Sequence, residues 1–234
     1  MGYSSEDVST HGFRRVANRR NNGADPNNAA AAFAFLDRER DADKPFFLCV
    51  SYNNPHNICE WARGERGALP DGTLPEPPPP EELPHPKANA EPPEDEPEIA
   101  AFLRRSYHAT RIFPVGDFTD KDWREYRWAY YRMAEQVDQY IGELLAGLDA
   151  RGLRDNTLVV FLSDHGDAQG AHRWNQKTVL FEESARVPLI VRWPGRVPAG
   201  RVSERLVNIG TDLMPTLLEV AGIDSPGDLP GASF

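Results

Sequence analysis

Five consecutive residues carry the clearest chemical signal in this sequence. Ser163-Asp164-His165-Gly166-Asp167 directly follows an apolar run, Thr157–Leu162, that has the length of a buried strand. In open parallel α/β sheets ligands bind outside the carboxyl ends of the strands, where these side chains would lie. A carboxylate beside an imidazole can bind one cation, and Gly166 allows a sharp turn beneath it. Spacing alone equally allows Asp164 to be a cap and His165 an ordinary loop residue.

Alternating helices and strands are expected to position these residues. Apolar residues from Trp123 to Leu148 recur three and four positions apart, which predicts one long amphipathic helix. The expected elements are a helix from Asp25, as its cap, to about Arg40, a doubly buried strand at Phe46–Tyr52, a helix from Asp122 to Leu148, strands at Thr157–Leu162 and Pro188–Trp193, and a helix from Asp212 to Val220. Helix-then-strand alternation indicates an α/β fold.

A segment rich in proline and acidic residues interrupts this alternation between Leu69 and Pro97, with four consecutive prolines at Pro77–Pro80. Proline has no backbone donor for a sheet, so we expect an extended surface excursion of polyproline character. We interpret residues 69–97 as an insertion within one domain. A plain insertion is favoured over a proline-rich ligand for a partner protein.

Charge and hydropathy exclude several classes of protein. A net charge of -10 argues against nucleic acid as a partner, because nucleic-acid binders gather Lys and Arg on one face. No apolar run reaches the roughly 18 residues of a membrane span, and Met1–His11 shows no signal-peptide pattern. Cys49, inside an apolar run, is expected to be buried, and with Cys59 it allows at most one internal disulfide. The oligomeric state and the redox compartment stay open.

Three longer blocks resemble one known family. The longest, Phe161–Gly195, contains S-D-H-G, then G-A-H, then K-T-V-L-F-E-E-S-A-R-V-P-L-I, and ends in W-P-G. Upstream stands K-P-F-F-L-C-V-S-Y-N-N-P-H, and downstream T-D-L-M-P-T-L-L-E-V-A-G-I. In this order the blocks are similar to those of sulfatases of the alkaline phosphatase superfamily. They anchor most of the chain from about residue 27 and leave residues 69–121 uncovered.

The resemblance implies an alkaline phosphatase-like fold, with a mixed, mostly parallel sheet and helices on both faces. Residues 1–234 would then be part of a catalytic domain, incomplete at its amino side. It also implies that Asp164 and His165 are ligands of a divalent metal. Calcium is the usual family metal and a hard cation suits the carboxylate, while the imidazole leaves manganese, magnesium or zinc open.

The same resemblance assigns catalytic roles. Lys177 matches the lysine that contacts the sulfate oxygens, so the sulfate would be held between the cation and this ammonium group. His56 matches a histidine that assists departure of the ester oxygen, and His172 is similar to another active-site histidine. The positions expected to orient the lysine segment through ion pairs are Glu182, Glu183 and Arg186. The positions expected to shape the substrate pocket around His56 are Asn54, Asn57 and Trp61.

The formylglycine nucleophile of the family arises from a C/S-x-P-S-R motif, and this string does not occur in the sequence. Cys59–Arg63 has the cysteine-to-arginine spacing, but Trp61 replaces the proline, so we interpret Cys59 as unmodified. The paired aspartates that complete the family metal site do not occur either. We therefore expect a truncated or split reading frame whose isolated chain has little or no sulfatase activity.

Three functions follow from these observations. The first is a metal-dependent sulfuric ester hydrolase acting on a sugar or aryl sulfate. The second keeps the superfamily but changes the ester, giving a phosphodiesterase or a phosphonate monoester hydrolase. The third is a non-catalytic fragment that binds a partner through an exposed sheet edge. Family tendency favours a periplasmic or extracellular location.

Overall fold

The computed structural model describes residues 12–16, 25–66, 69 and 73–234. Its described residues divide into two compact units, each treated by itself below. The first unit comprises Met1–Arg154 and Gly166–Arg186, and the second comprises Asp155–His165 and Val187–Phe234. Residues 70–72 of the proline-rich segment lie outside the described residues.

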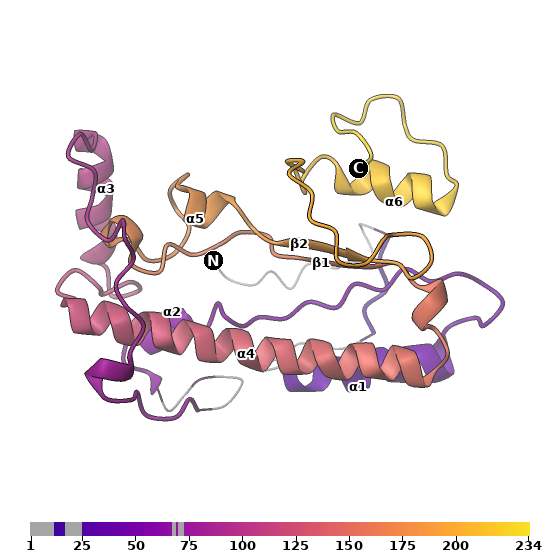
Figure 1. The fold of residues 1–234 in the computed structure, drawn as a ribbon, viewed down its shortest axis with the longest axis horizontal. Helices are drawn as coiled ribbons and strands as arrows, with labels where there is room; N and C mark the ends of the chain where they lie inside the picture. Colours follow the sequence, from indigo (N-terminus) through magenta and orange to yellow (C-terminus); the bar gives the residue numbers. More distant parts are fainter. Residues whose placement is uncertain (1–11, 17–24, 67–68, 70–72) are drawn as a thin grey trace. The chain divides into compact units, whose positions relative to one another are not determined.

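The first unit is organised around the long helix α4 (Asp120–Ala150), which confirms the helix predicted from Asp122 (Figure 1). Thr119 and Asp122 form a capping box at its start: each backbone N–H is accepted by the side chain of the other. Gly152, in the left-handed region with φ of 65°, follows its end. The predicted apolar stripe is largely buried from Trp123 to Met133, half-buried from Val137 to Leu144, and buried again at Leu148.

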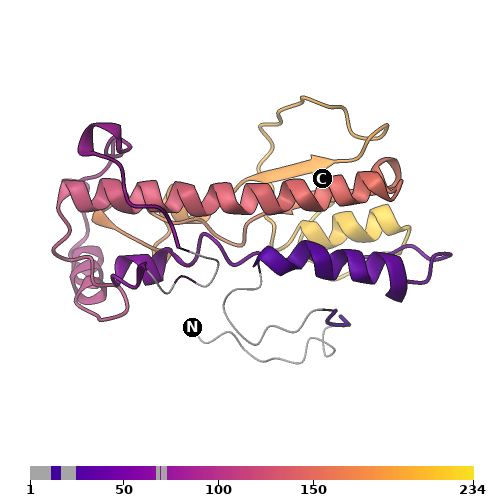
Figure 2. The same cartoon turned by 90° about the horizontal axis from the view of Figure 1, so that it is seen from below.

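The helical segment predicted from Asp25 to Arg40 is also confirmed, and it runs alongside α4 (Figures 1 and 2). Its parts are η2 (Asp25–Asn27), α1 (Asn28–Ala34) and η3 (Phe35–Glu39). Gly147 of α4 is required by this packing, because a Cβ there would lie 2.0 Å from the ring of Phe33. At the far end the Arg151 guanidinium donates to both carboxylate oxygens of Asp37, each at 2.7 Å.

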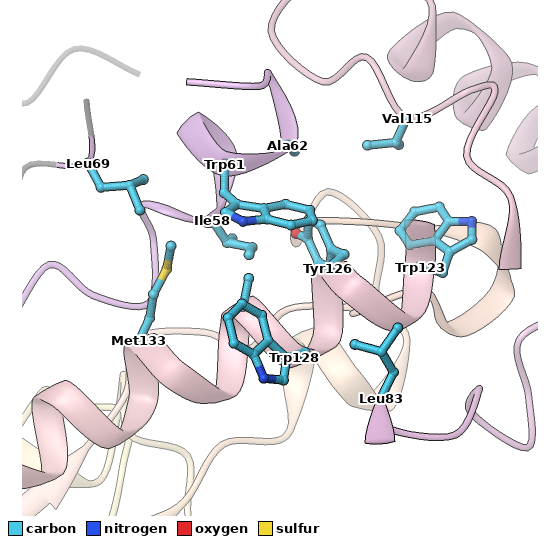
Figure 3. Close-up of a cluster of buried hydrophobic side chains, with 11 residues drawn as sticks. Ile58, Trp61, Ala62, Leu69, Leu83, Val115, Trp123, Tyr126, Trp128 and Met133 are labelled. Atoms are coloured by element: carbon cyan, nitrogen blue, oxygen red, sulfur yellow. The ribbon is translucent and has the colours of Figure 1, made fainter. Parts of the chain in front are cut away.

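The core of this unit lies between α2 (Ile58–Ala62) and the first half of α4 (Figure 3). The Trp61 ring meets Tyr126 edge to face at 6.2 Å between ring centroids, and Trp123 meets Tyr126 in the same way at 5.7 Å. Figure 3 shows Ile58 and Trp128 directed into the same cluster. Large aromatic side chains contribute most of the buried apolar surface here, so the α2 position is fixed by the core.

The proline-rich segment packs against α4. Leu83 is 3% exposed and belongs to the core cluster. The Arg124 guanidinium donates to the carbonyl oxygens of Pro80, Leu83 and Pro84. Proline has no backbone N–H, but its carbonyl oxygen can still accept a hydrogen bond. Two short elements accompany it, η5 (Pro80–Glu82) within the segment and α3 (Glu98–His108) after it.

The strand predicted at Phe46–Tyr52 is wrong, because the described residues there form no strand. Half-buried and exposed residues alternate along this run; Phe47 is 64% exposed and Cys49 is exposed, so the predicted burial of Cys49 is also wrong. An apolar run specifies a preference for extended backbone, but a strand exists only where a neighbour accepts and donates its hydrogen bonds.

The second unit contains a strand pair and a helix. β1 (Val159–Leu162) and β2 (Leu189–Arg192) confirm two predicted strands, and they pair antiparallel, with Val159 opposite Arg192 and Leu162 opposite Leu189. Both strands are largely half-buried, which corrects the expectation of a buried strand at Thr157–Leu162. Antiparallel pairs are a normal part of mixed sheets.

The remaining elements are short. Helix α6 (Leu213–Ala221) confirms the predicted helix after Asp212, and Gly222 caps it in the left-handed region. The others are η6 (Arg154–Asn156), η7 (Ala171–Arg173) and α5 (Glu182–Ala185). None of the helices in the described part of the chain is both long and apolar enough to span a bilayer.

Candidate functional site

Two catalytic residues predicted from distant parts of the sequence meet in the first unit. The ammonium nitrogen of Lys177 lies 3.4 Å from Nδ1 of His56, and both side chains are half-buried. An ammonium group can only donate, so the Nδ1 atom is the acceptor in this contact. With Nδ1 as the acceptor, the ring proton of a neutral His56 is on Nε2.

The backbone that carries His56 is held by a buried carboxylate. Asp25 is fully buried, and its oxygens accept the backbone N–H groups of Asn53 and Asn54 at 2.8 Å. Asp25 was expected as a helix cap, but α1 begins after Asn27 and the Asp25 carboxylate instead binds the segment before His56. Sequence reasoning missed this role, because an aspartate followed by proline at a helix start has an obvious local explanation.

The residues predicted to shape a pocket around His56 are buried beside it. Asn57 donates to the side-chain oxygen of Asn54 at 2.9 Å, and Asn54 donates to Gln136 of α4 at 3.1 Å. The exposed fractions are 6% for Asn54, 1% for Asn57 and 4% for Trp61. In this structure the side chains of Asn54 and Asn57 support the segment that carries His56, and the pocket-shaping role of all three residues stays a prediction.

The loop that carries Lys177 is anchored by Asp167, the last residue of the S-D-H-G-D string. Its carboxylate accepts the backbone N–H of Gln169 at 2.8 Å and of Gln176 at 3.1 Å, and the hydroxyl of Tyr126 at 3.3 Å. Burial raises the pKa of Asp167, and these donors and the charge of Lys177 only partly oppose that effect. Asp167 therefore positions the loop that carries Lys177. The sequence motif contains Asp167, but nothing in the motif indicated this role.

This loop holds four residues other than glycine in the left-handed backbone region. The residues, with φ between 50° and 68°, are Gln169, His172, Arg173 and Gln176. Such conformations cost of order 1–3 kcal/mol each, so the surrounding contacts must impose them. One such contact runs from the Gln176 amide to the sulfur of Cys59, 2.8 Å away in α2, and it ties Lys177 to the helix that follows His56.

His172 lies in a second cluster, together with a residue of the proline-rich segment. The amide nitrogen of Asn89 lies 3.3 Å from Nε2 of His172 and donates to the carboxylate of Glu183 at 2.7 Å. The backbone N–H of His172 donates to the Asn89 carbonyl, and its ring lies 4.2 Å from that of Phe181. Partial burial raises the pKa of Glu183, but the Asn89 amide and nearby positive charges outweigh it and lower the pKa overall.

Glu182 and Arg186, expected to orient the lysine segment, form a loose pair with each other. The charged groups are 3.9 Å apart and the two side chains are 81% and 77% exposed. Pairs this open contribute little to stability. Their orienting role stays a prediction.

Asp164 and His165, the predicted metal ligands, belong to the second unit. Nε2 of His165 lies 3.5 Å from an Asp164 carboxylate oxygen, and the Asp164 side chain is 84% exposed. One oxygen donor and one nitrogen donor at this separation fit two positions around a single cation. Among the described residues no group of three or more His, Cys, Asp or Glu side chains gathers as a metal site, so the ligand role of Asp164 and His165 stays a prediction.

Cys59 is expected to resist alkylation in the folded protein. It is 5% exposed, and burial raises the pKa of its thiol to about 11, so very little reactive thiolate exists near neutral pH. Cys49 is exposed and serves as the internal comparison. Peptide mass spectrometry after iodoacetamide treatment at about pH 8 should show Cys49 modified at least about tenfold faster than Cys59, with equal rates in denaturant. Rapid labelling of Cys59 in the native chain would contradict its observed burial.

Comparison with known proteins gives a consistent result. The sequence model of the family described as Sulfatase matches residues 3–223. The chain is 33% identical over 200 residues to the arylsulfatase of Clostridium perfringens, a match that covers 84% of this chain and 38% of that protein. A solved 2-O GAG sulfatase is similar with a TM-score of 0.75 and 25% identity, covering 95% of this chain and 47% of the other.

A second enzyme type has a similar structure. The phosphonate monoester hydrolase of Agrobacterium radiobacter matches with a TM-score of 0.63 and 27% identity, covering 88% of this chain and 40% of that one. This chain spans less than half the length of each of these three proteins. The solved sulfatase structures confirm the predicted fold class, the α/β fold of the alkaline phosphatase-like sulfatases.

Proposed function

Because the chain belongs to the sulfatase family, we propose that it forms part of an enzyme that hydrolyses the sulfate ester of a sugar or an aryl compound. The observation that carries this proposal is the contact between Lys177 and His56, which joins the two residues assigned to opposite ends of the scissile bond. The likeness to a 2-O GAG sulfatase supports a saccharide substrate, and family tendency supports a periplasmic or extracellular location.

The proposed chemistry divides the work between these two side chains. Hydrolysis forms a new bond from sulfur to an oxygen that comes ultimately from water, and the sulfur–oxygen bond of the ester breaks. The departing ester oxygen keeps the bonding electron pair, gains negative charge and needs a proton. The Nε2–H of His56 is the donor for that oxygen, because Nδ1 is engaged by Lys177. The ammonium of Lys177 offsets negative charge on the sulfate oxygens, and the contacts of Asp167 and Gln176 hold it in place.

Asp164 and His165 are proposed as metal ligands. Calcium is the first choice because of the carboxylate, with manganese, magnesium and zinc as alternatives. A cation held by such donors can offset negative charge on oxygen atoms. The exposed Asp164 carboxylate and the half-buried His165 imidazole offer two donors toward this role.

The second candidate, a phosphonate monoester hydrolase, is favoured by one observation, the structural likeness to the Agrobacterium enzyme. The arrangement of Lys177 and His56 suits a phosphonate ester as well, because both esters present negative oxygens and lose an alkoxide or phenoxide. The two proposals therefore differ in whether the enzyme prefers a sulfate ester or a phosphonate ester.

Separate titrations of the full chain with a sulfate ester and a phosphonate ester distinguish the two candidates. We expect phenyl sulfate to shift the imidazole NMR signals of His56 in a saturable titration, and phenyl methylphosphonate to require a higher concentration. The reverse order would support the phosphonate candidate, and no shift with either ligand would contradict both. A parallel turnover assay with 4-nitrophenyl sulfate and calcium is expected to show little release of sulfate by the isolated chain.

A further inference from the structure

The proline-rich segment contacts the loop that carries His172 through three consecutive residues. The carbonyl oxygens of Asn89 and Ala90 accept the backbone N–H groups of His172 and Arg173, at 2.7 and 2.8 Å. Glu91 pairs with the Arg173 guanidinium. His172 and Arg173 both lie in the left-handed backbone region, which such contacts help to impose. A segment that the family blocks leave uncovered is therefore part of the surroundings of a candidate site residue.

The backbone around Asn89 is itself held in place. Arg127 of α4 donates to the carbonyl oxygen of His85. The backbone N–H of Ala90 donates to the carbonyl oxygen of Lys87 at 3.1 Å, which closes a turn around Asn89. The prolines on the approach to this turn restrict the backbone further, because proline fixes φ. The Asn89 side chain is therefore presented to its partners from a defined position.

The orientation of the Asn89 side chain is set by Glu183. The amide nitrogen of Asn89 donates to a carboxylate oxygen of Glu183 at 2.7 Å. Partial burial raises the pKa of Glu183, but the Asn89 amide and nearby positive charge, such as that of Lys87, outweigh this effect and keep the carboxylate ionised near neutral pH. An ionised carboxylate can only accept, so the atom that faces it must be the nitrogen of the amide and not its oxygen.

That orientation decides which nitrogen of His172 carries the proton. The same Asn89 nitrogen lies 3.3 Å from Nε2 of His172, and it has a second N–H to donate. Nε2 is the acceptor in this contact, so the proton of the neutral ring is on Nδ1. Nδ1 is buried and has no hydrogen-bond partner among the described residues in either tautomer, so the contact at Nε2 is the one that distinguishes the two.

We propose that Asn89 is a positioning residue that holds the proton of His172 on Nδ1. Neither nitrogen of this ring then accepts a proton, because Nε2 is occupied by the Asn89 amide and Nδ1 already carries one. His56 has the opposite arrangement, with Nδ1 as the acceptor and the proton on Nε2. The division of work between the two rings rests on the proposed function: His56 gives its proton to the departing oxygen, and His172 supports the loop of Lys177. The tautomer of His172 does not rest on that function.

Two substitutions of Asn89 test the tautomer. Asn89→Ala removes the amide donor, and Asn89→Asp replaces it with a carboxylate that accepts a hydrogen bond from Nε2–H. Both keep the backbone carbonyl that His172 contacts, and Asn89 is exposed, so both are expected to fold. We expect the Nδ1–H form of His172 in about tenfold excess in the native chain, the effect of one hydrogen bond. Asn89→Ala should remove this excess and Asn89→Asp should reverse it. Asn156→Ala removes an exposed asparagine amide in η6 and should leave the tautomer unchanged.

Long-range proton–nitrogen NMR correlations of the full chain, carrying isotope-labelled histidine, report the tautomer at a pH where the ring is neutral. The His172 signals are assigned by their loss in His172→Gln. A proton on Nδ1 in the native chain and in Asn156→Ala, but not in either Asn89 variant, supports the proposal. A native ring with its proton on Nε2 overturns it without reference to any variant. A native tautomer in either Asn89 variant also overturns it, and if the melting temperature of that variant falls, the role of Asn89 is structural alone.

No ester takes part in this measurement, so its outcome is separate from that of the phenyl sulfate titration. A proton on Nδ1 that depends on Asn89, in a chain that binds neither ester, would end the proposed function and leave the role of Asn89 toward His172 standing. Phenyl sulfate binding with an Nε2–H tautomer at His172 would do the reverse.

Discussion

Replacement of Asp25 by alanine is expected to lower the free energy of unfolding by about 2–4 kcal/mol. The carboxylate is fully buried and accepts the backbone N–H groups of Asn53 and Asn54, so its removal leaves two donors unsatisfied inside the protein. Chemical denaturation followed by circular dichroism measures this change. The same variant should broaden the NMR signals of His56, because the segment that carries this residue loses its anchor.

Asp43→Ala provides the control, since Asp43 lies at an exposed position of the loop after the first helical segment. It should change the free energy of unfolding by less than about 0.5 kcal/mol. If Asp25→Ala were no more destabilising than Asp43→Ala, the carboxylate would not be anchoring this segment. Asp25→Asn should fall between the two, because the amide keeps one acceptor but loses the charge.

Lys177→Met is expected to weaken phenyl sulfate binding by about tenfold or more. The substitution keeps most of the side-chain length and removes the charge and the donor that contacts His56. Titration of the full chain, followed through the His56 imidazole, gives the dissociation constant directly. Neutral phenol should bind the native chain and the variant alike, because it presents no negative oxygens to the ammonium.

Two further variants serve as controls for the Lys177→Met measurement. Lys44→Met removes a lysine that is 76% exposed and pairs with Asp41, so it controls for the loss of one positive charge. Lys177→Arg restores the charge and should recover part of the affinity. Undiminished phenyl sulfate binding by Lys177→Met would exclude Lys177 as a sulfate-contacting residue.

The sequence by itself determined the helices and the family. The apolar stripe of α4 has the helical period, and its capping box and Gly152 mark the ends. Each of these signals depends only on residues close to one another in the sequence. Ordered blocks such as S-D-H-G and K-x-x-x-F-E-E identified the family for the same reason. They also selected His56 and Lys177 from residues 121 positions apart, which the structure then brought together.

Only the tertiary structure decided how those residues are held and which apolar runs become strands. Phe46–Tyr52 has the composition of a strand but no pairing partner in the described chain. Asp25, Asp167 and Asn89 contact groups that are distant in sequence, those of Asn54, Tyr126 and Glu183 respectively, and no local pattern marks such contacts. Helical period and family motifs depend on neighbouring residues, whereas burial and hydrogen-bond satisfaction depend on which distant segments pack together.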